Sequence, residues 1–180
     1  MKPISIFVAM CLSAAAGALI VGYDGRHLSA LAPVEVHYAP AENLEAIDAA
    51  LIGEAREAID MAAYVLTDSA VLLALHEAAL RGVRIRLYRQ PDEHPPSVAI
   101  ETMLETLTAS PNVTQRFKPA GGDPMHLKSY CVDGRTLRGG AANFSASGLK
   151  RQENDLVVLR GPGACAGFEA TFEKAWENTR

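Results

Sequence analysis

Residues 126–133 read His126-Leu127-Lys128-Ser129-Tyr130-Cys131-Val132-Asp133, and residues 139–143 read Gly139-Gly140-Ala141-Ala142-Asn143. The first run has the composition of a strand, and residues two apart on a strand project from the same face. His126 and Lys128 are therefore expected to present an imidazole and an ammonium group side by side. A nucleophile beside a fixed positive charge suits an attack on phosphorus.

The full spacing is His126-x-Lys128-x4-Asp133-x6-Gly140-x-x-Asn143. This pattern resembles the HKD motif of the phospholipase D superfamily, whose members cleave phosphodiesters without a metal ion. Because the chain carries one motif, it is also similar to the small, Nuc-like bacterial endonucleases, from about Val34 to Trp176. The resemblance implies an α/β fold in which helices flank a mixed β-sheet, in a single domain.

The resemblance also implies a role for each motif residue. His126 would be the nucleophile that forms a phosphohistidine intermediate. Lys128 and Asn143 would bind the phosphoryl oxygens, and the glycine turn at Gly140 would let backbone N–H groups approach them. Asp133 precedes a glycine in a turn, so we expect it to hold the motif strand rather than to touch substrate.

A reactive histidine needs an acceptor that orients its second nitrogen. In the superfamily this acceptor is an acidic residue at the start of the strand after the motif, and Glu153 matches best, with Asp155 as the alternative. One position departs from the family, because Ala141 replaces a serine whose hydroxyl would contact phosphate. Ser145 and Ser147 lie nearby as substitutes.

The leaving group needs a proton from a second histidine. Single-motif relatives form dimers in which both chains lend this histidine to one shared site, so we expect a homodimer built on His126. The other histidines, such as His37 and His76, are interpreted as structural or solvated.

The first residues, 1–22, combine one lysine with a long uncharged stretch that ends in small residues. This pattern predicts a cleaved export signal or, because the stretch is nearly long enough to span a bilayer, an uncleaved membrane anchor. Residues 23–33 are expected to be a linker and residues 34–180 the catalytic domain. The domain would then lie outside the cytoplasm, in the periplasm or secreted.

After export, Cys131 and Cys165 remain. They could pair in an oxidising compartment, but the sequence favours a small buried thiol at Cys131. The sequence contains neither C-x-x-C nor H-E-x-x-H. It therefore predicts no metal site, and we expect no cofactor.

The net charge of −4 argues against a protein that coats nucleic acid by charge alone. A local basic groove is expected from four cations near the motif, Arg135, Arg138, Lys150 and Arg151. The first functional hypothesis is an exported nuclease that acts on DNA, with RNA as a further substrate. The alternatives are a phospholipase D that releases a lipid headgroup and a degenerate module that only binds nucleic acid or phospholipid.

Periodicity and turn residues predict the remaining elements. The expected strands cover residues 34–38, 61–66, 83–88, 113–117 and 154–159, together with the motif strand. The expected helices cover residues 42–59, 98–107 and 168–178, and a further helix that Asp68 or Ser69 caps and Gly82 ends.

Overall fold

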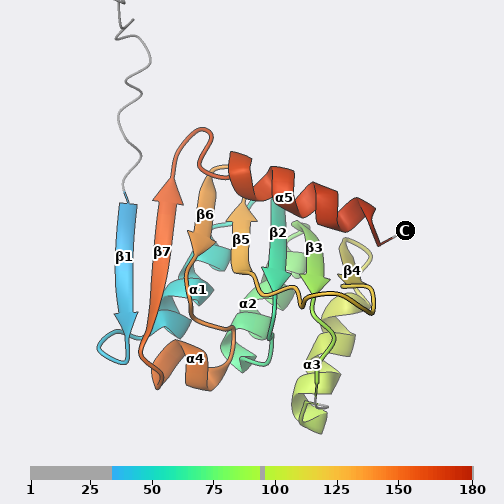
Figure 1. Ribbon diagram of the computed structural model, residues 1–180, viewed down its shortest axis with the longest axis horizontal. Coiled ribbons are helices and arrows are strands. Elements are labelled where there is room, and N and C mark those ends of the chain that lie inside the picture. Colours follow the sequence, from blue (N-terminus) through green and yellow to red (C-terminus); the bar gives the residue numbers. More distant parts are fainter. Residues whose placement is uncertain (1–33, 94–95, 180) are drawn as a thin grey trace, which may run out of the picture. The chain divides into compact units, whose positions relative to one another are not determined.

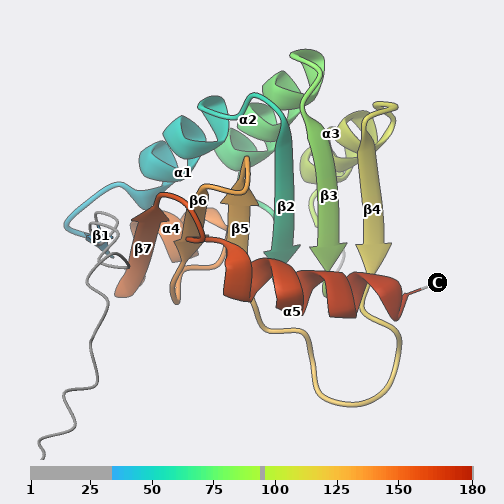
Figure 2. The same ribbon diagram turned by 90° about the horizontal axis from the view of Figure 1, so that it is seen from above.

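The computed structural model of the chain describes residues 34–93 and 96–179 (Figure 1). Their strands form one seven-stranded sheet in the order β1-β7-β6-β5-β2-β3-β4. The pairs from β1 to β2 along this order are antiparallel, whereas β2, β3 and β4 run parallel. The sheet is therefore mixed, and helices lie on both of its faces (Figure 2). This arrangement confirms the predicted α/β fold.

The strands are β1 (Val34–Ala39), β2 (Ala58–Ala63), β3 (Arg84–Arg89), β4 (Val113–Phe117), β5 (Lys128–Val132), β6 (Thr136–Gly139) and β7 (Asn154–Arg160). The helices are α1 (Leu44–Gly53), α2 (Ser69–Leu80), α3 (Val98–Thr108), α4 (Ala146–Lys150) and α5 (Ala166–Glu177).

The helix predicted over residues 42–59 is wrong at both ends, and most clearly at its carboxyl end. Asn43 caps α1, the helix ends at Gly53, and Ala58 and Ile59 already belong to β2. Ile59 continues the helical spacing of apolar residues in the sequence, yet it reaches the same core from a strand. Short elements leave little periodicity to read, which also explains why the sequence did not predict β6 and α4.

The start and end of α2 follow the prediction. The Asp68 carboxylate accepts hydrogen bonds from the N–H groups of Ala70 and Val71, at 3.0 and 3.1 Å, and so caps the helix. Gly82 follows the helix with a φ of +88°, a conformation that glycine adopts without a steric cost.

Apolar side chains fill two clusters, one on each face of the sheet. The larger cluster packs α1, α2 and α3 against the inner face and includes Leu44, Leu75 and Ile85. The smaller cluster lies where α5 crosses the outer face, and its members are Ala62, Tyr88, Met125, Phe172 and Trp176. Trp176 of α5 is buried.

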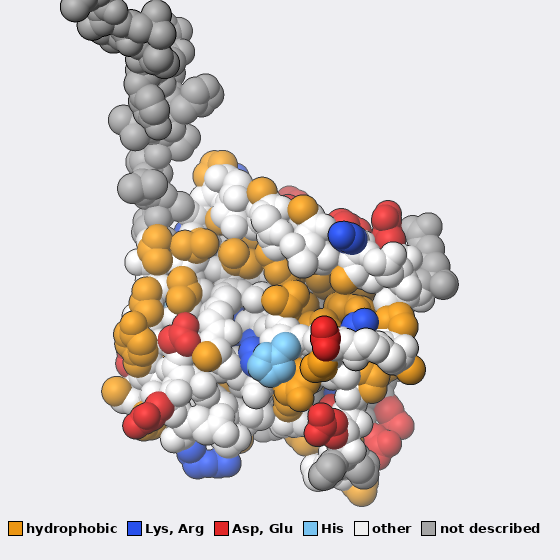
Figure 3. All heavy atoms as spheres, in the orientation of Figure 1, with side chains coloured by type: hydrophobic (Ala, Val, Ile, Leu, Met, Phe, Trp, Pro, Cys, Tyr) orange, Lys and Arg blue, Asp and Glu red, His pale blue; other side chains and the backbone are white. Residues whose placement is uncertain are grey.

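The part of the outer face formed by β1 and β7 is left uncovered by α5. Side chains at alternate positions of β1 point outward, and Val34, Val36 and Tyr38 are 59%, 44% and 60% exposed. Through the β1–β7 register, these residues lie opposite Leu159, Val157 and Asp155. Figure 3 shows the resulting group of apolar side chains over β1 and β7. We call the outward side chains of β1 and β7, with Leu137 of β6, the open apolar face.

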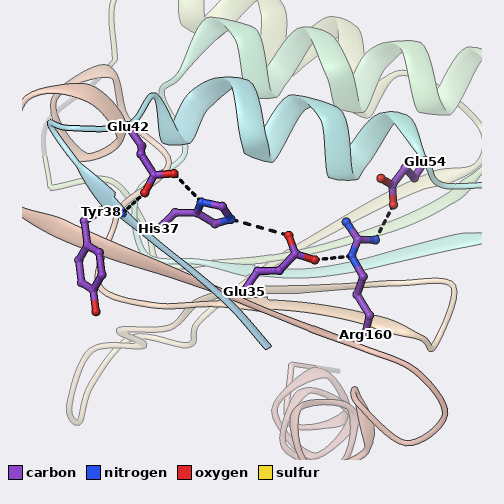
Figure 4. A network of polar contacts seen from close by, with 6 residues as sticks. All are labelled: Glu35, His37, Tyr38, Glu42, Glu54 and Arg160. Carbon is purple, nitrogen blue, oxygen red and sulfur yellow. Dashed lines mark hydrogen bonds and ion pairs between the residues drawn. The ribbon is translucent and has the colours of Figure 1, made fainter. Parts of the chain in front are cut away.

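The inward side chains of β1 form polar contacts instead (Figure 4). The His37 Nδ1 atom lies 2.7 Å from a Glu42 carboxylate oxygen, which ties β1 to the turn before α1. The Arg160 guanidinium of β7 joins Glu35 and Glu54 at 2.9 and 2.8 Å. These contacts give His37 a structural environment, as the sequence analysis expected.

Cys131 and Cys165 form a disulfide bond, so the interpretation of Cys131 as a free buried thiol is wrong. Cys131 is the last but one residue of β5 and points toward the outer face, while Cys165 is the N-cap of α5. The two positions are 34 residues apart. Only the tertiary fold brings them together, and the sequence held no spacing signal for the pair.

The predicted export segment, residues 1–22, and the predicted linker, residues 23–33, lie outside the described residues. Within residues 34–93 and 96–179, no helix has both the length and the apolar character needed to cross a bilayer.

Candidate active site

The motif residues gather where β2 ends and β5 begins. Ala63, the last residue of β2, pairs with Lys128, the first residue of β5. One residue further out, the Tyr64 N–H donates to the Leu127 carbonyl at 2.9 Å. His126 therefore lies just before β5. The prediction that it lies within the strand is wrong. Its side chain is exposed.

Tyr64 brings the imidazole and the ammonium group of the motif together. The His126 ring packs on the Tyr64 ring with centroids 4.4 Å apart, and the Lys128 Nζ atom lies 4.6 Å from the centroid of the same ring. The Lys128 Nζ also donates to the His126 carbonyl oxygen at 2.8 Å. No role was predicted for Tyr64 from the sequence.

Lys128 is a buried cation, with 6% of the residue exposed. Burial lowers the pKa of its ammonium group below the ordinary lysine value, because desolvation penalises the charged form. Among the described residues, no carboxylate forms an ion pair with it. A substrate anion would therefore meet a cation whose charge is not already neutralised.

Asn143 follows β6 and precedes α4. Its side-chain carbonyl oxygen is buried and has no hydrogen-bond partner among the described residues. Its backbone is fixed, because the Asn143 carbonyl accepts from Ser145 N–H at 2.8 Å, and a Cβ on Gly148 would lie only 2.6 Å from it. The backbone is thus held in place. Among the described residues, the side-chain NH2 group of Asn143, which is the donor that a phosphoryl oxygen needs, forms no hydrogen bond.

Gly140 is required by close packing as well as by its conformation. Its φ is +128°, and a Cβ there would lie 2.5 Å from the Asp155 carbonyl oxygen. The two N–H groups that follow are already occupied, since Ala141 donates to the Asp155 carboxylate at 3.2 Å and Ala142 to the Asp155 carbonyl at 3.3 Å. The turn therefore anchors the motif to β7 and does not point these N–H groups at a ligand.

The two candidates for the histidine partner differ in their surroundings. Glu153 is exposed just before β7, whereas Asp155 is partly buried within β7 and binds Ala141. Among the described residues, neither carboxylate forms a hydrogen bond with the His126 ring. The choice between them stays a prediction.

Ser145, one of the two serines near Ala141, has a structural role. Its Oγ accepts from the Gly148 N–H at 3.1 Å and caps α4. Ala141 is itself exposed.

Asp133 is a structural residue of the motif. Its carboxylate accepts hydrogen bonds from the N–H groups of Arg56, Glu57 and Ala58, at 3.0, 2.9 and 2.9 Å. Burial acts to raise the pKa of this carboxyl, but the backbone hydrogen bonds outweigh it and the pKa is lowered. Asp133 thus ties the end of β5 to the chain that enters β2, as the turn had suggested.

The expected basic groove is not formed by the four cations near the motif. Arg138 is fully buried and pairs with Asp48 of α1, and Lys150 pairs with Glu45. Arg135 and Arg151 remain exposed. A signal for the buried pair did exist in the sequence, because Asp48 lies one helical turn after Leu44, on the apolar side of α1.

In the described part of the chain, one group of three side chains has the spacing of a metal site, namely Cys131, Cys165 and Glu169. Its two sulfur atoms are joined in the disulfide bond. The two cysteines therefore cannot act as thiolate ligands of a metal ion.

The chain matches the protein family described as "Cardiolipin synthase, PLD-like domain" over residues 49–176. It belongs to this family of the phospholipase D superfamily. The match runs from within α1 to α5, so it covers every strand except β1, and it includes every motif residue from His126 to Asn143. The resemblance inferred from the motif spacing is confirmed.

Among known proteins, the mitochondrial cardiolipin hydrolase of Chlamydomonas reinhardtii is 28% identical to the chain over 130 residues, which are 70% of this chain and 54% of the relative. The chain thus spans about half the length of the curated relatives it matches. Among solved structures, Nuc from Salmonella typhimurium superimposes with a TM-score of 0.73 and 23% identity, over 82% of this chain and 96% of Nuc. NucT from Helicobacter pylori gives 0.69 and 19%, over 81% and 96%. These structures show the same fold.

Proposed function

We propose that the protein is a phosphodiesterase that works without a metal ion, through a phosphohistidine intermediate on His126, and that it acts as an exported endonuclease on DNA, with RNA as a further substrate. The observation that carries this proposal is the shared packing of His126 and Lys128 on Tyr64, at 4.4 and 4.6 Å. An exposed imidazole and a desolvated ammonium group in one small patch suit nucleophilic attack on an anionic phosphodiester.

The reaction would proceed in two steps. A nitrogen of His126 attacks phosphorus and the bond to the leaving oxygen breaks, while Lys128 and Asn143 bind the non-bridging oxygens. The leaving alkoxide takes a proton from the imidazole of a second copy of His126. That second imidazole then removes a proton from water as the water attacks the phosphohistidine, which releases the phosphate product and restores both histidines.

A homodimer would supply the second histidine. The open apolar face supports this proposal, because Val36 and Tyr38 are exposed and lie on β1 beside Asp155 of β7, which contacts the motif turn. Apolar side chains gathered on an otherwise folded domain are typical of an interaction surface. A two-fold contact near this face would place the two motif turns close together.

The compartment is also part of the proposal. A disulfide bond such as Cys131–Cys165 persists in oxidising environments and is rare in the cytosol. It supports an exported protein, in the periplasm or secreted, with residues 1–22 as a cleaved signal or a membrane anchor.

A phospholipid substrate is the second candidate. The relatives in Chlamydomonas reinhardtii and Danio rerio are described as cardiolipin hydrolases. Two of the four cations near the motif are paired with acidic residues, and the face that carries the motif exposes apolar side chains such as Tyr38 and Leu127. These features favour a lipid surface over a strongly electrostatic partner.

One experiment separates these substrates. The full chain and a His126→Ala variant are incubated with excess EDTA, in parallel on supercoiled plasmid, on phosphatidylcholine vesicles and on cardiolipin vesicles. Plasmid nicking that requires His126 would establish the nuclease, and phosphatidate formation without nicking would establish the lipid hydrolase. Binding without turnover of any substrate would identify a degenerate member, for which the loss of the serine hydroxyl at Ala141 would be the first explanation to test.

A further inference from the structure

Arg138 is a fully buried arginine whose five N–H donors all have acceptors. Its Nε and one Nη2 hydrogen bind the two carboxylate oxygens of Asp48, both at 2.9 Å. Its Nη1 donates to the Lys128 carbonyl at 2.7 Å and to the Ala142 carbonyl at 3.3 Å, and Nη2 also reaches the Ala142 carbonyl at 3.3 Å. The guanidinium has no donor left for a ligand, so it cannot touch the substrate.

The surroundings of Arg138 hold the guanidinium in one orientation. The two hydrogen bonds from Arg138 itself fix the Asp48 carboxylate, and the Tyr130 hydroxyl adds one further hydrogen bond to it at 2.9 Å. The centroid of the Phe144 ring lies 4.5 Å from the guanidinium carbon of Arg138. Because Arg138 and Asp48 are both completely buried, water cannot take the place of either partner.

The two carbonyl groups that Arg138 joins belong to the phosphate site. One is the carbonyl of Lys128 itself, and the other is that of Ala142, the residue before Asn143. The β5–β6 ladder cannot connect them, because its last pair is Tyr130 with Arg138, and the chain turns away at Gly140. The side chain of Arg138 therefore replaces the ladder at the point where the two phosphate-binding residues lie.

Stability alone is a weak reason for such a pair. Removing two charges from water costs several kcal/mol for each ion, and an apolar replacement of similar volume is often as stable. A planar fork with fixed donor directions, by contrast, sets the distance between the carbonyl groups that it binds. In enzymes, a displacement of about 1 Å in such groups can lower the rate about 100-fold.

We propose that Arg138, oriented by Asp48, is a positioning residue that fixes Lys128 relative to Asn143 in the phosphate site. The inference rests on the proposed phosphodiesterase and deepens it, because it says how the fold keeps the two phosphate-binding side chains in register. Arg138 acts only through the backbone of Lys128 and Ala142.

The test compares Arg138→Lys with Tyr130→Phe. A lysine keeps the charge opposite Asp48, but its single ammonium group cannot reach the carboxylate and both carbonyls with the geometry of a fork. Tyr130→Phe removes a buried hydrogen bond to Asp48 and leaves every Arg138 contact with Lys128 and Ala142 intact. Tyr130→Phe is therefore the control that shows how much activity is lost when this part of the core is merely destabilised.

Both variants are measured with bis(p-nitrophenyl) phosphate, a simple phosphodiester that is neither DNA nor lipid, and their unfolding free energies are measured by urea titration. We expect Arg138→Lys to lower kcat by about 10- to 100-fold and, because phosphate is bound less tightly, to raise KM as well. Tyr130→Phe should keep kcat within about twofold despite a comparable loss of stability. Equal losses of kcat in the two variants would overturn the inference and leave the proposed function standing.

A binding measurement keeps the two proposals separable. Affinity for inorganic phosphate is followed by calorimetry in the same proteins. If the wild type binds phosphate but hydrolyses nothing, weaker binding by Arg138→Lys alone still supports the positioning role, while the proposed catalysis fails. If the wild type does neither, both proposals are wrong. Should Arg138→Lys not fold, the pair Asp48→Leu with Arg138→Met, which leaves no unpaired charge, is measured in its place with the same expected loss.

Discussion

The two ends of β5 belong to one motif but are built in opposite ways. At the start of the strand, the His126 ring is exposed, and the amide oxygen of the nearby Asn143 has no partner among the described residues. At the far end, Asp133 accepts three backbone hydrogen bonds, and Cys131 is joined to Cys165. In this motif, the polar groups that are hydrogen-bonded within the protein hold the structure together. The groups that lack such partners are the ones proposed to act on substrate.

The strongest test of this contrast is His126→Ala. We expect phosphodiesterase activity to fall on the order of 10⁴-fold, because the nucleophile is lost. The free energy of unfolding should change by less than about 0.5 kcal/mol, since the side chain is exposed. Initial rates and urea denaturation of the same preparation check both statements. A large loss of stability would show that the residues at the start of β5 also hold the structure together.

The disulfide bond should matter for stability and little for chemistry. Replacing Cys131 and Cys165 together by alanine frees a loop of 34 residues, and we expect a loss of about 3–4 kcal/mol in the free energy of unfolding. Chemical denaturation with and without reductant measures the effect, and the reductant should change the wild type only. Loss of kcat in protein that is still folded would contradict the separation between the two ends of β5.

Asp133→Asn removes a charge that three N–H groups bind. We expect a loss of about 1–3 kcal/mol at neutral pH, because an amide can accept at one oxygen only.

The pH dependence follows from the lowered pKa of Asp133. Its contribution to stability is complete above the unfolded-state pKa, about 3.9 for a model peptide, and is lost as the pH falls through the lower folded-state value. Between about pH 5 and pH 2, the stability of the variant should therefore fall less steeply than that of the wild type. Thermal unfolding of the wild type and of Asp133→Asn across this pH range tests the prediction. Parallel plots of stability against pH for the two proteins would contradict it.

The smallest effect is expected from Ala141→Ser, which restores the hydroxyl found in the family. One neutral hydrogen bond to a phosphoryl oxygen contributes about 1 kcal/mol, so kcat/KM should rise by about fivefold. Ala141→Gly serves as the control for a change in the backbone. An unchanged rate would mean that the anchoring of this turn by Asp155 already fixes the site without a hydroxyl.

The sequence by itself determined the superfamily, the α/β class and the motif residues, because those depend on residue type and spacing along a few short segments. It also placed α2 well, because Asp68 and Gly82 mark its ends with local chemistry. The helix predicted to Ile59 failed since apolar spacing alone does not separate the end of a helix from a buried strand that follows it.

Only the tertiary structure decided which motif neighbours serve the site and which serve the core. Arg138 looked like part of a basic groove, yet it is buried against Asp48, a residue 90 positions earlier in the chain. Cys131 was interpreted as a free thiol, yet it forms a disulfide bond with Cys165, the N-cap residue of α5. Both outcomes depend on contacts between segments far apart in sequence. The position of Asp48 on the apolar side of α1 indicates a buried carboxylate, but spacing along one chain does not identify its partner.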